Sequence, residues 1–175
     1  MRSRFCIFAL ALLMVVPAFA QTAPLSRDVV REKLRASLAK YGLLDDVNTT
    51  FRQSEKQPYN FVGSMKAGLK NAESLEVVIS VTTHDTIGIR VYPHYNGGYI
   101  NLNKARNSGG LMRKLLQYSD TNFLYWGADD TFDVFCGYTF TLESGYPEDA
   151  MKIVLRSIHN TDQYVGEVRE FIDAE

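Results

Sequence analysis

The residues that could carry out acid–base or metal chemistry are few and scattered in this sequence. His84 and Asp85 are adjacent and His94 follows ten residues later, so the three could form a metal or acid–base site if the fold brought them together. The sequence contains no HExxH, CxxC or GxSxG string. His84 and Asp85 are also common residues of solvated turns. We therefore expect no catalytic residue, and a small metal-binding protein or hydrolase that uses His84, Asp85 and His94 is an alternative.

Asp129, Asp130 and Asp133 form a second group of potential ligands. Hard cations such as calcium prefer several oxygen ligands from one loop. The segment lacks the alternating acidic pattern with a central glycine and the distal glutamate of a calcium loop. A polar β-turn explains Asp129 and Asp130 more simply. We expect neither a metal nor a cofactor.

Cys136 and Cys6 are the two cysteines of the sequence. The apolar residues around Cys136 alternate with a period of two, which places its thiol in the apolar row of a strand. A reactive cysteine needs a lowered pKa and access to solvent. We therefore interpret Cys136 as a small buried hydrophobic residue.

Residues 1–20 have the pattern of a secretory signal. Two arginines precede an apolar run over residues 5–16, and a proline and three small or apolar residues follow, ending at Ala20. A membrane-spanning helix needs about 17 to 25 apolar residues, so this run is too short for an anchor. The pattern predicts cleavage after Ala20 and a periplasmic or secreted protein that has no membrane span after cleavage.

The remaining residues, 21–175, have the length and composition of a single domain. Two of the 19 basic side chains lie in residues 1–20, so 17 basic side chains are present with 20 acidic ones. No basic excess is available for nucleic acid or for an anionic membrane surface. The many aromatic residues argue against intrinsic disorder.

Apolar residues with a period near 3.6 predict a helix over residues 26–41, capped by Ser26 and ended by Gly42. The polar residues 43–59 predict a loop. Apolar residues then return at helical spacing over residues 61–69, which predicts a short second helix.

From Leu75 the apolar period changes to two, which predicts strands. The expected order is three strands of a meander, a helix whose start is delayed or kinked by Gly109 and Gly110, a two-stranded hairpin and a long helix. These elements are expected over residues 75–83, 87–91, 99–102, 103–119, 123–126, 132–142 and 147–172. The sequence therefore predicts an α+β fold, in which a five-stranded antiparallel sheet is packed by an N-terminal, a middle and a long C-terminal helix.

One face of this predicted sheet is unusually apolar. If Cys136 and the apolar residues of strand 87–91 face the helices, the opposite face carries Val78, Arg90, Tyr92, Leu124, Trp126, Phe135 and Thr139. Exposed apolar patches mark partner sites, and Trp, Tyr and Arg dominate binding energies. The predicted protein-binding residues are therefore Arg90, Tyr92, Trp126 and Phe135. Coverage of this face by the predicted helix 61–69, or by a second copy of the chain, is the alternative.

Four strings in the second part of the chain mark strand and helix boundaries: Tyr99-Ile-Asn-Leu-Asn-Lys-Ala-Arg106, Asn122-Phe-Leu-Tyr-Trp126, Phe132-Asp-Val-Phe135 and Glu143-Ser-Gly-Tyr-Pro-Glu-Asp-Ala150. These strings and the element order resemble the YbjN family, whose fold is similar to that of the type III secretion chaperones. The resemblance covers roughly residues 75–172 and implies a non-catalytic module that binds other proteins or assists their handling. The chain departs from that family in its secretion signal and in the glycines of its middle helix.

These observations predict an exported, non-catalytic protein-binding or chaperone-like module of the bacterial cell envelope, with residues 21–175 forming one YbjN-like domain. Its expected partners are periplasmic proteins or a second copy of the chain in a homodimer, and not nucleic acid. Besides the metal-binding protein or hydrolase, a small-ligand carrier that uses the apolar sheet face as a pocket wall is an alternative.

Overall fold

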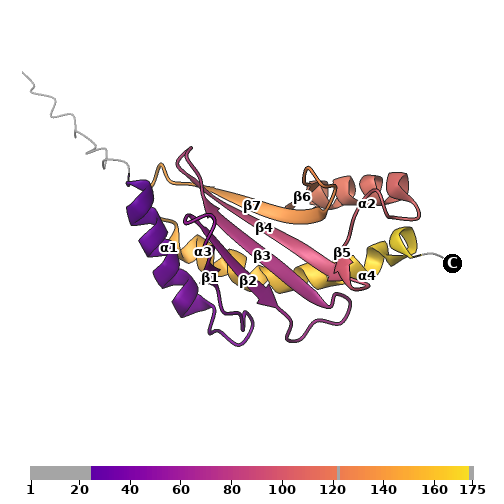
Figure 1. The fold of residues 1–175 in the computed structure, drawn as a ribbon, viewed down its shortest axis with the longest axis horizontal. Coiled ribbons are helices and arrows are strands. Elements are labelled where there is room, and N and C mark those ends of the chain that lie inside the picture. Colours follow the sequence, from indigo (N-terminus) through magenta and orange to yellow (C-terminus); the bar gives the residue numbers. More distant parts are fainter. Residues whose placement is uncertain (1–24, 122, 174–175) are drawn as a thin grey trace, which may run out of the picture.

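The computed structural model describes residues 25–121 and 123–173 (Figure 1). The signal predicted for residues 1–20 lies outside these described residues. The described chain is an α+β protein with one antiparallel sheet and a layer of helices, so the predicted fold class is confirmed. The predicted strand count is wrong, because the sheet of the described chain has seven strands and not five.

The strands are β1 (Arg52–Gln53), β2 (Asn60–Met65), β3 (Ser74–Val81), β4 (Thr86–Tyr95), β5 (Gly98–Tyr99), β6 (Tyr125–Ala128) and β7 (Val134–Thr141). Their order in the sheet is β1-β2-β3-β4-β7-β6, and β5 pairs with one end of β4. All neighbouring strands are antiparallel. The centre of the sheet is therefore formed by the long strands β3, β4 and β7.

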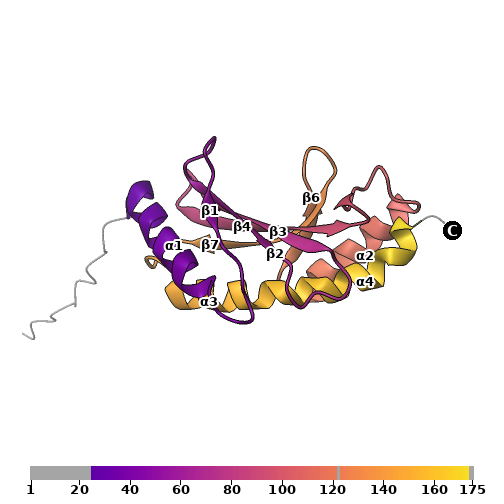
Figure 2. The same cartoon turned by 60° about the horizontal axis from the view of Figure 1, so that its bottom comes forward.

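The helices lie together on one side of this sheet, as Figure 2 shows. They are α1 (Arg27–Tyr41), α2 (Ser108–Thr121), α3 (Glu148–Ser157), the 3₁₀ turn η1 (Ile158–Asn160) and α4 (Thr161–Ile172). α4 packs across β4, α2 packs against β6 and α4, and α1 packs against α3 and β3. The other side of the sheet carries no helix of the described chain.

The core lies between the sheet and the helices. Alternate residues of the central strands are buried there, among them Leu75, Val77, Ile79 and Val81 of β3 and Ile87, Ile89 and Val91 of β4. Cys136 pairs with Val91 and Phe140 pairs with Ile87, so the predicted apolar row of the last strand faces the helices. This prediction is confirmed, because residues that pair directly across strands point to the same face.

Residues 60–65 form β2 and not the predicted helix, and β2 pairs with β3 from Asn60↔Ser80 to Met65↔Leu75. Phe61 and Met65 are buried and lie four residues apart, a spacing that fits one face of a helix and equally one face of a strand. Pairing with β3 satisfies the backbone of this segment along its whole length. The predicted loop before it also contains the short strand β1.

The expected third strand over residues 99–102 is reduced to β5. Asn96 and Gly97 adopt positive φ angles of 53° and 80° in the tight turn before it. After Tyr99 the chain leaves β4, and an isolated bridge from Asn101 to Asp133 connects it to the loop before β7. β5 therefore ends the meander with two residues and not with a full strand.

The middle helix begins later than residue 103, but Gly109 and Gly110 lie inside its first turn and do not delay its start. α2 starts at Ser108, and the Asn107 side chain accepts the N–H of Gly110 at 2.8 Å. A Cβ atom at Gly110 would lie 2.6 Å from the Phe171 ring, so α4 approaches α2 closely at this glycine. Gly110 thus serves close packing between two helices.

The predicted long C-terminal helix is divided. η1 separates α3 from α4, although Ile158, Thr161 and Val165 stay buried across the junction. The Thr161 N–H donates to the Ile158 carbonyl three residues back, which is the tighter hydrogen-bond pattern of a 3₁₀ turn. The apolar stripe therefore continues against the sheet through a change in helix geometry.

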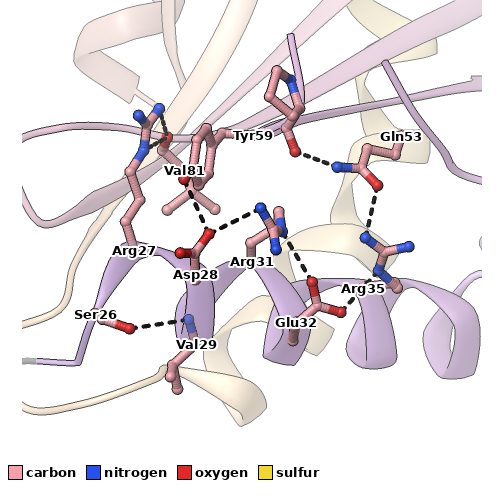
Figure 3. Close-up of polar contacts among 11 residues, drawn as sticks. Ser26, Arg27, Asp28, Val29, Arg31, Glu32, Arg35, Gln53, Tyr59 and Val81 are labelled. Atoms are coloured by element: carbon pink, nitrogen blue, oxygen red, sulfur yellow. Dashed lines mark hydrogen bonds and ion pairs between the residues drawn. The ribbon is translucent and has the colours of Figure 1, made fainter. Parts of the chain in front are cut away.

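α1 is fixed to the sheet by polar contacts at its N-terminus (Figure 3). The Ser26 hydroxyl caps the helix by accepting the Val29 N–H at 3.3 Å, as predicted. Arg27 donates two hydrogen bonds to the Val81 carbonyl, at 3.0 and 2.6 Å, and its guanidinium lies 3.6 Å from the Tyr59 ring centroid. The Tyr59 hydroxyl in turn donates to Asp28 at 3.0 Å. These contacts join α1 to the ends of β2 and β3.

Candidate functional site

The side of the sheet without helices presents a connected group of aromatic and cationic side chains, which we call the open-face cluster: Arg90, Tyr92, Tyr99, Tyr125 and Phe135. Pairing places Val78, Arg90, Gly137 and Tyr125 in one row across β3, β4, β7 and β6. Tyr92 and Phe135 belong to the adjacent row on the same face. The cluster is therefore built on backbone that the sheet holds rigidly.

Two glycines let the aromatic rings of β6 and β7 lie against the sheet. Tyr125 pairs with Gly137, where a Cβ atom would lie 2.8 Å from both Cζ and Oη of Tyr125. Gly127 pairs with Phe135, where a Cβ atom would lie 3.2 Å from Cζ of Phe135. Each ring thus occupies the space that a side chain would fill on the opposite strand. The result is an aromatic surface that spans two strands, in which the Tyr125 and Phe135 rings meet edge to face.

The rings of the cluster contact one another. The Phe135 centroid lies 5.6 Å from that of Tyr92 and 6.1 Å from that of Tyr125, and Tyr92 lies 5.8 Å from Tyr99. Phe135 is only 6% exposed because its neighbours cover it, whereas Tyr99 and Tyr125 are 40% and 41% exposed. Phe135 therefore supports the surface, and the two tyrosines present apolar area to solvent.

Arg90 lies at the centre of the cluster on β4. Its guanidinium lies 4.6 Å from the Phe135 centroid, and Nη1 donates to the Tyr92 hydroxyl over a long 3.5 Å. The Tyr92 hydrogen bond is the main cause of its raised pKa, against the opposing effect of burial. Within the described chain Arg90 forms no ion pair, and Asp129 acts on it only from a longer distance. Most of its N–H donors are therefore available to a partner.

A polar group borders the cluster where β3, β4 and β5 meet. The Tyr99 hydroxyl donates to Glu76 at 3.1 Å, and His94 Nε2 lies 3.9 Å from the same carboxylate oxygen. Burial, followed by the charge and hydrogen bond of Glu76, raises the pKa of Tyr99 to about 12. Tyr99 is therefore a neutral hydrogen-bonded phenol at neutral pH, and its ring is fixed in place.

Of the predicted binding residues, Arg90, Tyr92 and Phe135 come together, but Trp126 lies on the opposite face. Trp126 pairs with Cys136, is 8% exposed, and packs at 5.7 and 5.8 Å from the Tyr118 and Tyr164 rings of the helix layer. Its predicted position on the open face is wrong because alternation within each strand leaves the relative phase of β6 and β7 open, and a shift of one residue in their pairing exchanges the two faces.

The sequence analysis missed Tyr125 and Tyr99 as members of the cluster. A sequence pattern could have placed Tyr125 on this face. On both β6 and β7 an aromatic residue and a glycine alternate, so each aromatic ring can pair with a glycine on the opposite strand. Matching Tyr125 with Gly137 and Phe135 with Gly127 fixes the register. For Tyr99, the hairpin after Asn96-Gly97 places it beside His94 on the same face.

The described chain contains no helix that covers the cluster, although coverage by a helix was one alternative from the sequence. That alternative placed a helix over residues 61–69 on this face, but residues 60–65 form β2 within the sheet. The face therefore stays open in the described part of the chain, and a second copy of the chain is one candidate to cover it.

The residues of the metal or hydrolase alternative are not brought together. His84 and Asp85 form the turn before β4, whereas His94 lies near the far end of this ten-residue strand. At about 3.4 Å per residue the two histidines are separated by roughly 30 Å. Among the described residues, no group of three His, Cys, Asp or Glu side chains could hold a metal ion.

Asp129, the first of the aspartates near residue 130, is used within its own turn. Asp129 Oδ1 accepts the Thr131 N–H at 3.0 Å, the Thr131 hydroxyl at 2.8 Å and the Asp133 N–H at 3.0 Å. Partial burial raises the pKa of Asp129, but these hydrogen bonds outweigh it and lower the pKa below its ordinary value. The turn interpretation therefore accounts for these residues.

Cys136 is fully buried, and burial raises the pKa of its thiol to about 12. Thr161 of α4 is its hydrogen-bonding neighbour at 3.4 Å. Its interpretation as a buried hydrophobic residue is confirmed.

A hollow of about 450 Å³ lies on the helix side of the molecule, near the end of α3. Polar residues of the loop after α1, of α3 and of η1 line it, including Asp45, Asn48, Arg156 and His159. Asp46 and Arg156 pair with each other at its edge. The hollow is thus remote from the open-face cluster and is not a pocket walled by the apolar sheet face.

No family model and no curated protein matches this chain. In the described part of the chain, no helix combines the length and apolar character needed to cross a bilayer.

Proposed function

We propose that the chain is a non-catalytic protein-binding or chaperone-like module that is exported to the cell envelope and binds its partner through the open-face cluster. The observation that carries this proposal is an aromatic surface around Arg90 on the uncovered side of the sheet. Large exposed apolar surfaces on small soluble domains typically mark interaction sites.

The composition of the cluster supports binding. Tyrosine and arginine are enriched among the residues that dominate interface energies, and both have rigid flat ends that lose little entropy on binding. Tyr99 and Tyr125 offer partly exposed rings, while Phe135 and the sheet backbone hold them in place. The surface is thus organised before a partner arrives.

Binding through the face agrees with the state of the sheet edges. The edge strand β1 has two residues and β6 has four. The Trp126 N–H on β6 already donates to Ser119 of α2 at 2.8 Å. Short and occupied edges are poor templates for addition of another strand.

The proposal also includes export, which depends on the signal pattern of residues 1–20. It includes the resemblance to the YbjN family, which depends on the four sequence strings given above. A periplasmic or secreted location would restrict the partners to proteins of the envelope or to a second copy of the chain.

Site-specific photo-crosslinking in intact cells tests the proposal. A benzophenone-bearing phenylalanine replaces Tyr125 on the open face, and the matched control carries it at Ile153, which is 65% exposed on α3. We expect an adduct with a discrete protein, or with a second copy of the chain, at position 125 and none at position 153. No adduct at position 125, or the same adducts at both positions, would refute the proposal.

A further inference from the structure

The charge of the open face differs from that of the whole chain. The full sequence has a formal net charge of −1, yet the middle row of the open face contains two arginines and no carboxylate. Pairing gives the order Arg52, Val62, Val78, Arg90, Gly137, Tyr125 across the sheet. Neither guanidinium forms an ion pair within the described chain. The centre of the face therefore carries uncompensated positive charge.

The nearest carboxylates do not neutralise this charge. Glu76 lies in the next row, where it accepts the Tyr99 hydroxyl and faces His94. Asp129 is bound by the backbone and side chain of its own turn. Both carboxylates are therefore committed to local contacts, and Arg90 keeps the greater part of its donor capacity.

The surroundings of Arg90 favour an anionic group that is itself attached to apolar chain. The guanidinium is stacked on Phe135 with Tyr92 beside it, while Val62 and Val78 extend the row on the other side. A planar guanidinium matches the two oxygens of a carboxylate, and an ion pair beside apolar groups is less screened by water than one on an open surface.

We propose that the open-face cluster binds an acidic peptide segment of a partner protein, in which a carboxylate pairs with Arg90 and apolar side chains on either side contact Tyr99, Tyr125, Val62 and Val78. This inference depends on the proposed function and adds the chemistry of the partner. Neighbouring strands are spaced about 4.8 Å apart, so Arg52 lies roughly 14 Å from Arg90 along the row. A second carboxylate about four extended residues away reaches Arg52.

Selection of random peptides displayed on phage, with the purified protein as the target, tests this inference. The wild-type protein is expected to enrich peptides with Asp or Glu between apolar residues. Arg90→Gln is expected to lose this enrichment, and Arg90→Lys, which keeps the charge but not the planar fork, to retain it in weaker form. The control Arg113→Gln changes an exposed arginine of α2 on the helix side and is expected to behave as wild type.

An enriched peptide then provides the quantitative test. Replacing its acidic residue by the matching amide is expected to weaken binding to the wild-type protein about tenfold, because a charge-assisted hydrogen-bonded pair is lost. The same change is expected to have little effect on binding to Arg90→Gln. Circular dichroism melting curves establish that each variant is folded.

The outcomes separate this inference from the proposed function. Enriched peptides without acidic residues, or an acidic motif that survives in Arg90→Gln, would overturn the inference and leave the proposed function standing if Tyr125→Ser abolishes their binding. Failure to enrich any peptide would overturn the inference, and the proposed function would then be decided by the crosslinking at position 125. Binding of anionic phospholipid vesicles that depends on Arg90, without an acidic peptide motif, would overturn the inference in favour of a lipid surface.

Discussion

The carboxylate of Asp162 joins the loop before β3 to the start of α4. Oδ1 accepts the N–H groups of Asn71 and Ala72 at 2.9 and 2.7 Å, and Oδ2 accepts that of Lys70 at 2.8 Å. Burial raises the pKa of Asp162, but the three backbone hydrogen bonds outweigh it and lower the pKa below its ordinary value. The conformation of this loop therefore depends on an ionised Asp162.

Asp162→Asn is expected to lower the free energy of unfolding by about 2 to 4 kcal/mol. The NH₂ group of asparagine replaces one carboxylate oxygen, so a donor then faces a backbone N–H donor and a hydrogen bond is lost. Urea unfolding at neutral pH measures this loss. The control Asp120→Asn changes an exposed residue of α2 and is expected to stay within about 0.5 kcal/mol of wild type. Equal stability of Asp162→Asn and wild type would contradict the assigned role.

The same carboxylate gives a defined pH dependence. Its folded pKa is lower than its unfolded pKa, which is near 3.9 for an aspartate, so its stabilisation is complete above that value and is lost as the pH falls through the folded pKa. The difference in unfolding free energy between wild type and Asp162→Asn is therefore expected to shrink below about pH 4. A difference that stays constant from pH 7 to below pH 4 would show that ionisation is not involved.

Gly137 is required beneath Tyr125. A Cβ atom there would lie 2.8 Å from the Ile89 carbonyl oxygen as well as from the Tyr125 ring. Gly137→Ala is expected to destabilise the protein by about 1 to 3 kcal/mol and to displace Tyr125, as measured by thermal unfolding and by tyrosine fluorescence. The control Gly88→Ala lies one strand away with nothing within 4 Å of its Cβ position, and is expected to be neutral or slightly stabilising. Equal effects of the two changes would exclude steric crowding as the cause.

At the scale of single residues, the sequence predicted which side chains within one strand share a face, but not how the faces of two strands match. The burial of Cys136 and the shared face of Arg90 and Tyr92 follow from alternation within a strand. Trp126 was misplaced because alternation leaves the relative phase of two strands open, and a shift of one residue moves a side chain to the other face. The pairings of Tyr125 with Gly137 and of Phe135 with Gly127 fix that phase.

At the scale of elements, Arg27 provides a polar link between α1 and the end of β3, beside the apolar packing of the helix. Arg27→Met is expected to lose two hydrogen bonds to Val81 and the stacking on Tyr59, and to destabilise the protein by about 1 to 3 kcal/mol. The control Arg35→Met removes an exposed arginine that contacts Glu32 and Gln53, so a change below about 0.5 kcal/mol is expected. Chemical unfolding measures both, and a larger loss for Arg35→Met would contradict this assignment.

The elements that were misassigned share a physical cause. Phe61 and Met65 satisfy helical and extended spacing alike, and the decision for β2 comes from pairing with β3, which a local pattern does not contain. The strand expected after Asn96-Gly97 is short because the chain leaves β4 and turns toward α2. Asn101 then pairs with Asp133 and not with β4. Long-range pairing overrides local propensity at both positions.

At the scale of the whole molecule, the chain forms a two-layer structure with helices on one side of the sheet and the open-face cluster on the other (Figure 2). The sequence predicted the α+β class and which strand faces enter the core, because both depend on periodicity within elements. It left two alternatives for the opposite face, open or covered by a helix, because the outcome depends on residues 60–65 joining the sheet. The candidate site is thus a consequence of topology.

Cysteine labelling in cells tests most directly whether this face is an interaction surface. Cys136 provides no background, because its thiol is buried and burial raises its pKa to about 12. In a Cys6→Ser background, Thr139→Cys places an exposed thiol on the open face and Ile153→Cys places one on α3. Labelling rates with a maleimide are compared between intact cells and the purified protein diluted to a monomer.

A bound partner is expected to protect Thr139→Cys several-fold in cells relative to the purified protein, while the Ile153→Cys rate changes little. Equal ratios at the two positions would mean that the open face is free in the cell, which would contradict its role as the binding surface.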